Sequence, residues 1–304
     1  ARTFGGQNQI RTPRGADLNI SQPIYRGGPT FAATHDAENT VQAESARLTE
    51  TEQDVLLATA TAYLNVFRDE VVLKLNINNE QVLKRQLETT RDRFEVGKIT
   101  RPDVHQAEAR LAGANADRID SEGKLEASRA AYRNVVGQPA PRNFKAPAAP
   151  AGEPETQAEA NKAAALGNPA VLSAEFERKA LLDNVDEVRG ELRPSVSLNF
   201  NLSRDWENTS NTNISREEDI TASVTIPLYQ QGEVFSRLRE AKQDVAEQLQ
   251  AVDQARRDAV EDATRAWESL VTVRARVKAF KAQNEANMVA LEGVESEAQV
   301  GSRK

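Results

Sequence analysis

The sequence contains two copies of one pattern, separated by a fixed offset of about 204 residues. An inserted residue would rotate the apolar face of a helix away from its partner, so an offset kept over about 75 residues indicates a tandem duplication. The second copy reaches Lys304 where the first is at Thr100, and we expect it to be cut off in mid-unit. The matched positions are Pro23 and Pro227, Tyr25 and Tyr229, Gly28 and Gly232, Val41 and Val245, Tyr63 and Trp267, Leu87 and Leu291, and Gly97 and Gly301.

Each copy contains segments in which apolar and polar residues alternate strictly, over 16–21, 195–202 and 220–226. Period two places all apolar side chains on one face of a strand and the polar ones on the other. Such segments fit half-buried strands of a soluble sandwich. The alternative is strands of a membrane barrel with lipid outside and water inside.

A very long helix is predicted after the first proline-containing turn, because residues 30–94 contain neither proline nor glycine. At 1.5 Å per residue such a helix is roughly 100 Å long. Apolar or alanine residues recur every seven positions in both copies, which indicates a coiled-coil seam. They are Val41, Leu48, Val55 and Ala62, and Leu238, Val245, Val252, Ala259, Ala266, Val273 and Phe280.

The first long helix is predicted to turn back on itself in a tight hairpin. Gly97 can take the left-handed conformation that closes a helix, and Thr100 and Asp103 can cap the next one, which runs to about residue 136. A proline- and alanine-rich linker follows, and then further helices over about 155–191. We expect three segments: a first repeat over 1–138, a linker with helices over 139–193, and a second repeat over 194–304.

The composition excludes several classes of protein. The chain has no cysteine and two histidines, so it lacks disulfides and thiolate ligands and leaves little room for histidine-based metal or catalytic sites. A net charge of −7 argues against a nucleic-acid partner. The sequence shows no nucleophile–base pair, glycine-rich phosphate loop or metal-ligand spacing. We therefore expect no enzyme activity, catalytic residue, metal site or cofactor.

Motifs at 22–28, 61–66, 93–97 and 226–232 follow one another along the chain, and the last of them repeats the first. In this order the motifs resemble those of the TolC-like outer-membrane efflux proteins. The resemblance implies a mainly α fold with β, built from two tandem strand–long-helix repeats. Four strands per chain would join a trimeric twelve-stranded barrel that continues into an α-helical coiled-coil tunnel. Relative to the family, an initial helix, most of the first strand and the last helix of the second copy would be missing.

The resemblance also implies a function: the outer-membrane channel of a tripartite efflux or type I secretion system of a Gram-negative cell, with its tunnel in the periplasm. The protein would be a homotrimer in a lipid bilayer that works with a periplasmic adaptor and an inner-membrane pump. An iris-like gate would involve Asp103 and Arg303. The residues expected to dock the adaptor are Phe94, Val96, Gly97, Lys98, Ile99, Val300, Gly301 and Ser302. The alternative is a soluble periplasmic coiled-coil adaptor or scaffold.

Overall fold

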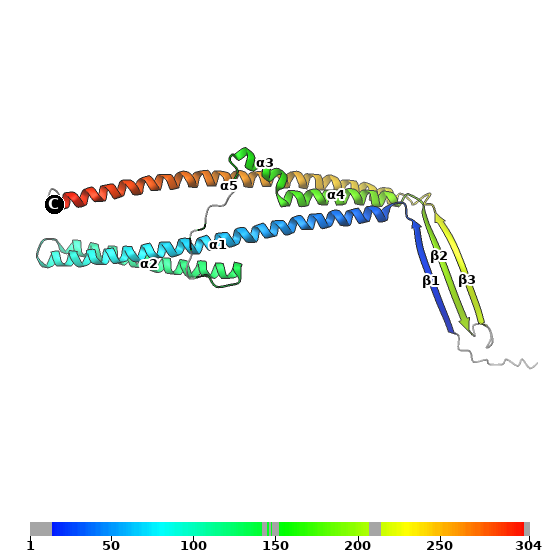
Figure 1. Cartoon of the computed structure of the whole chain (residues 1–304), viewed down its shortest axis with the longest axis horizontal. Helices are drawn as coiled ribbons and strands as arrows, with labels where there is room; N and C mark the ends of the chain where they lie inside the picture. The colour runs from blue at the N-terminus through cyan, green and yellow to red at the C-terminus, as the bar shows by residue number, and fades with distance from the viewer. Residues whose placement is uncertain (1–13, 142–144, 146, 148–151, 207–213, 301–304) are drawn as a thin grey trace, which may run out of the picture. The chain divides into compact units, whose positions relative to one another are not determined.

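The computed structural model describes residues 14–141, 145, 147, 152–206 and 214–300. Over these residues the chain is mainly helical and carries one small sheet, as the sequence predicts (Figure 1). The elements in chain order are β1 (Arg14–Tyr25), α1 (Pro29–Glu95), α2 (Arg101–Val136), α3 (Gln157–Gly167), α4 (Pro169–Gly190), β2 (Ser195–Trp206), β3 (Ile214–Thr225) and α5 (Glu233–Val300).

The two long helices have nearly the lengths that the sequence predicts. Helix α1 has 67 residues and α5 has 68, and each begins a few residues after its proline-containing turn. In both copies the turn includes a glycine with positive φ, Gly28 at +104° and Gly232 at +84°. The two turns therefore share one backbone feature, a glycine in the left-handed region.

The sheet is antiparallel, with β2 between β1 and β3 within the described residues. The register places Leu18 opposite Leu202, and Ile20 opposite Phe200, which in turn faces Ile220. Because directly opposite residues share a face, the three alternating patterns combine into one apolar face and one polar face. One register shift, between Pro23 and Tyr25, falls where proline cannot donate a ladder hydrogen bond.

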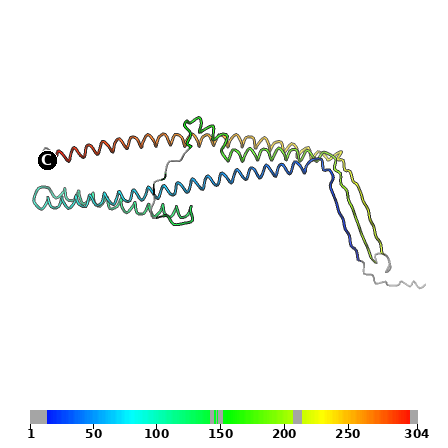
Figure 2. Tube along the Cα trace, viewed as in Figure 1, coloured from blue at the N-terminus to red at the C-terminus, as the bar shows by residue number. Residues whose placement is uncertain are grey.

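By its contacts the chain forms two compact units, residues 1–47 with 155–304, and residues 48–154. In the second unit the later part of α1 lies antiparallel to α2 (Figure 2). Val66 is fully buried there, and Asn76 Nδ2 donates a 2.5 Å hydrogen bond to the buried Ser121 hydroxyl. The division predicted from the repeat, over 1–138, 139–193 and 194–304, follows the duplication instead and stays a prediction.

In the first unit α4 packs along α5. Val171, Val185 and Val188 of α4 are buried, as are Val252 and Ala259 of α5. These two α5 residues belong to the predicted seven-residue seam. Five other seam positions are 49–60% accessible in this chain: Val41, Leu48, Val55, Val273 and Phe280. A single chain therefore covers only part of its own seam.

Candidate functional site

The junction between the sheet and the helices depends on a close approach of two backbones. Gly27 has a φ of +81°, and a Cβ placed on it would lie 2.5 Å from the Gly190 carbonyl oxygen and 2.8 Å from Arg193 Cβ. A Cβ on Gly190 would lie 2.7 Å from Pro29 Cδ. Arg193 Nη1 also donates a 3.0 Å hydrogen bond to the Gly27 carbonyl. The turn after β1 is thus held directly against the end of α4.

The corresponding turn of the second copy has a glutamine instead of a glycine in the left-handed conformation. Gln231, which corresponds to Gly27, has a φ of +55° and is the one described non-glycine residue with a positive φ. A left-handed conformation costs a residue with a Cβ about 1–2 kcal/mol. Sequence comparison of the two copies shows the glutamine, but only the backbone angle shows that it is strained.

We expect Gln231→Gly to raise the free energy of unfolding by about 0.5–1 kcal/mol, because glycine removes the left-handed strain but gains flexibility when unfolded. Gln230→Gly is the matched control, since Gln230 has no positive φ and should lose stability instead. Thermal unfolding in detergent measures both. Equal losses for the two variants would contradict the assignment of strain to Gln231.

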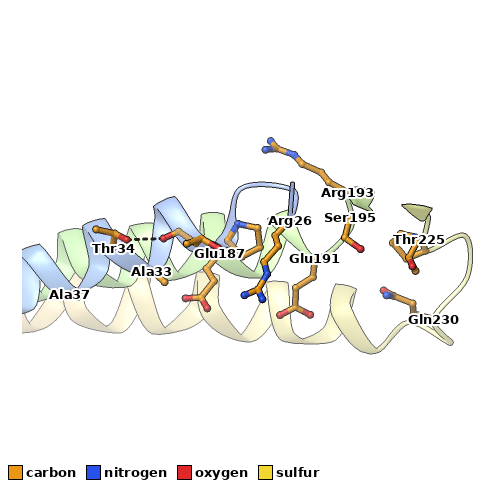
Figure 3. Close-up of a pocket in the computed structure, with 13 residues that line it drawn as sticks. Arg26, Ala33, Thr34, Ala37, Glu187, Glu191, Arg193, Ser195, Thr225 and Gln230 are labelled. Atoms are coloured by element: carbon orange, nitrogen blue, oxygen red, sulfur yellow. Dashed lines mark hydrogen bonds between the residues drawn. The ribbon is translucent and has the colours of Figure 1, made fainter. Parts of the chain in front are cut away.

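A hollow of about 900 Å³ lies at this junction, between the start of α1, the end of α4 and the adjoining strand ends (Figure 3). In Figure 3 Arg26 extends toward the side of Glu187 and Glu191, whereas Arg193 extends away from them. Arg237 of α5 forms a two-pronged ion pair with Glu191 at the edge of the hollow. Sequence reasoning missed these charged residues, because they come together only when β1, α4 and α5 meet.

The hairpin tip has the closing geometry that the sequence predicts. The Gly97 N–H donates to the Phe94 carbonyl and the Lys98 N–H to the Arg93 carbonyl, both at 2.9 Å, with Gly97 at a φ of +72°. These two bonds form the Schellman motif that ends many helices. The predicted docking residues Phe94 and Val96 are exposed, and Lys98 and Ile99 line a shallow hollow of about 440 Å³ at the tip.

Asp103 caps α2 in the structure. Its carboxylate accepts hydrogen bonds from the Thr100 hydroxyl at 2.6 Å and the Thr100 N–H at 2.8 Å, which confirms the predicted capping arrangement. Both bonds favour the ionised form and hold the pKa of Asp103 below its ordinary value. The stability that this cap contributes is therefore fully present at pH values above the ordinary pKa of an aspartate, and it is lost as the pH falls through the lowered pKa of Asp103.

The other predicted site residues are placed only in part. Arg303, Gly301 and Ser302 lie outside the described residues. Val300 is the last residue of α5. The gate role of Asp103 and Arg303 and the docking role of the tips therefore stay predictions.

The exposed sheet carries the clearest functional signal among the described residues. On the apolar face Leu18, Ile20 and Ile220 are 50%, 52% and 71% accessible in this chain. The polar face carries a hydrogen bond of 2.7 Å between Ser21 and Asn199 across β1 and β2. An apolar face left open beside a hydrogen-bonded polar face is what strands between lipid and water require. No helix in the described part of the chain is long and apolar enough to cross a bilayer.

One helical hairpin, a further long helix and a small two-faced sheet fit the class of outer-membrane efflux channels. The chain belongs to the outer membrane efflux protein family, whose model matches residues 3–138 and 161–304. It is therefore an outer-membrane protein of the Gram-negative type, and the resemblance inferred from the motifs is confirmed.

Several known proteins are similar to this chain. The outer membrane efflux protein BepC of Brucella suis is 28% identical over 96% of the chain, and outer membrane protein TolC of Vibrio cholerae is 29% identical over 96%. The chain spans 64% of the length of BepC and 70% of that TolC. Among solved structures, CusC has a TM-score of 0.77 at 16% identity, covering 100% of this chain and 72% of its own. VceC of Vibrio cholerae has a TM-score of 0.74 at 16% identity, covering 96% and 77%.

Proposed function

We propose that the protein is a passive exit duct of the outer membrane, a homotrimer whose chains pool their strands into one twelve-stranded barrel continued by a helical tunnel. It serves a tripartite efflux or type I secretion system, and it performs no chemistry on its cargo. Membership of the efflux family and similarity to proteins named TolC and BepC support this proposal. Similarity to AprF of Pseudomonas aeruginosa, named an alkaline protease secretion protein, supports secretion as well as efflux.

The two-faced sheet is the observation that carries the proposal. Strand β2 is paired on both sides, but within the described residues β1 and β3 each pair on one side only. Unpaired strand edges are not tolerated in lipid, so neighbouring chains must complete the ladder. Apolar side chains then face the bilayer and polar side chains face the water-filled duct.

The exposed part of the helical seam supports the same assembly. Val41, Leu48 and Val55 repeat every seven residues and are left uncovered by this chain. A coiled-coil seam is stabilised when such residues insert between those of a facing helix. In the proposed trimer the facing helices come from the neighbouring chains. A soluble adaptor or scaffold would use the seam but would give the open apolar face of the sheet no partner.

The partners follow from the proposed role. A passive duct needs a pump in the inner membrane and a periplasmic adaptor that reaches the tunnel. We place the adaptor at the exposed tip around Phe94, Val96 and Lys98, and at the corresponding second tip. We place the gate at Asp103 and Arg303.

Asp103→Ala is expected to raise the single-channel conductance of the protein in planar bilayers, because it removes the proposed ion pair. Asp103→Asn separates the gate from the cap: asparagine still accepts from the Thr100 N–H but carries no charge. If the ion pair holds the gate, both variants conduct more than the wild type. Asp120→Ala, which removes another surface carboxylate of α2, should leave conductance unchanged. A wild-type conductance for Asp103→Asn would count against the gate and leave Asp103 as a helix cap.

A further inference from the structure

The end of the sheet that lies farthest from the helices carries a basic cluster on its apolar face. The register places Arg204 directly opposite Arg216, and Arg14 opposite Trp206 in the next row outward. Because residues in one row share a face and alternate residues along a strand return to it, all three arginines lie on the same face as Leu202 and Ile220. We call Arg14, Arg204 and Arg216 the basic rim.

The cross-strand pair within the basic rim is unfavourable by itself. Directly opposite side chains have their Cβ atoms about 5 Å apart, and like charges at that distance destabilise a sheet. Glu218 forms an ion pair with Arg216 and is the one carboxylate on this face among the described residues. Arg204 instead lies over the Trp206 ring, at 5.1 Å from its centroid. The three arginines thus outnumber the carboxylate available to them on their face.

The opposite face has the opposite charge. Asp17, Asp205, Glu217 and Asp219 occupy the alternate positions of the same strands. The Asn201 amide donates a 3.2 Å hydrogen bond to Asp219 on that face, and a Cβ on Gly15 would meet the Asp205 carboxylate at 2.7 Å. Four of the five acidic side chains of the three strands therefore lie on the polar face, and all three arginines of the strands lie on the apolar face. If these charged residues served only to keep the strand ends in water, positive and negative side chains would be mixed on both faces of the sheet.

The basic rim lies near the depth of a lipid headgroup in the proposed barrel. Along β2, four successive residues of this face are apolar: Val196, Leu198, Phe200 and Leu202. The next β2 residue on the same face is Arg204. Eight residues of strand separate Val196 from Arg204, which is about 26 Å along the strand and about 20 Å of height at the 35–45° tilt of barrel strands. The lipid-facing apolar band of outer-membrane barrels is about 25 Å tall. Half-buried Trp206 lies beside the rim, as aromatic residues do at the membrane interface.

We propose that the basic rim binds the phosphate groups of a phosphorylated glycolipid in the outer leaflet of the membrane. This inference rests on the proposed function, which turns the apolar face to lipid and the strand ends away from the periplasm. A phosphate between Arg204 and Arg216 accepts hydrogen bonds from both guanidinium groups and removes their mutual repulsion. Arg14 stands one row farther out, where a second phosphate of the same lipid is within reach.

Native mass spectrometry of the protein in detergent tests the proposal, with lipid A carrying two phosphates as the probe. Phosphatidylethanolamine, which has no net charge, is the comparison lipid. We expect the wild type to prefer lipid A by about tenfold or more, and Arg204→Gln/Arg216→Gln to lose that preference. Arg204→Lys/Arg216→Lys keeps the charge but not the two-pronged geometry and should fall between them. The matched control is Arg26→Gln, an exposed arginine at the other end of the sheet, which should bind as the wild type does.

Three results would overturn the inference. The double glutamine variant could keep its preference for lipid A, phosphatidylethanolamine could bind as tightly as lipid A, or inorganic phosphate at equal concentration could compete fully with the lipid. A measurement of channel conductance distinguishes failure of the lipid-binding inference from failure of the proposed channel function. A double variant that conducts normally but has lost lipid preference supports both proposals. A wild type that neither conducts nor forms trimers overturns the duct.

Discussion

Ile220→Lys is expected to abolish assembly of the protein in the outer membrane. Ile220 lies in the middle row of the apolar face, opposite Phe200, and is 71% accessible in the single chain. A lysine on the lipid face near the bilayer midplane costs about 2–4 kcal/mol, and the proposed trimer incurs that cost three times. The measurement is the amount of heat-resistant trimer recovered from the outer membrane fraction.

Thr221→Lys is the matched control for that variant. Thr221 is the next residue along β3, so it lies on the polar face, where its hydroxyl bonds to Asp219. A lysine there meets water and acidic neighbours, and trimer recovery should stay near the wild-type amount. Equal loss from both variants would show that the two faces of the sheet do not differ in environment.

Gly27→Ala is expected to lower the free energy of unfolding by about 2–4 kcal/mol, the second-largest effect. The added methyl group is strained by the φ of +81°, which costs about 1–2 kcal/mol, and it also overlaps the Gly190 carbonyl and Arg193 Cβ. The backbone of α4 cannot move away without opening the junction with the sheet. Thermal unfolding of the trimer in detergent measures the loss.

Gly232→Ala separates the two causes of that loss. Gly232 has nearly the same φ, +84°, but a Cβ there meets nothing within 4 Å. Its alanine variant should therefore show only the conformational part, about 1–2 kcal/mol. If Gly27→Ala loses no more than Gly232→Ala, the close approach to Gly190 does not stabilise the junction.

The helices were predictable because their signals are local. Absence of glycine and proline over 30–94 predicted α1 to within a residue at each end. Gly97 and Thr100 predicted the hairpin tip, since a left-handed closure and a helix cap each depend on a few neighbouring residues. The strand pattern likewise predicted one apolar and one polar face.

What the sequence did not show depends on contacts between distant segments. The pairing of Arg204 with Arg216 follows from a register fixed by the whole sheet. The requirement for glycine at position 27 comes from Gly190, which lies on another element. The seven-residue pattern predicted a seam but not which part of it this chain covers, because coverage depends on neighbouring helices. The proposed partner of Asp103 likewise depends on an assembly of several chains.

The mass of the protein in detergent micelles tests the central claim most directly. Light scattering that separates the protein from the bound detergent should give three chains per particle, and the protein should aggregate or precipitate when detergent is removed. A monodisperse single chain that stays folded in buffer without detergent would contradict the account, because its apolar sheet face and unpaired strand edges would then need neither lipid nor neighbouring chains.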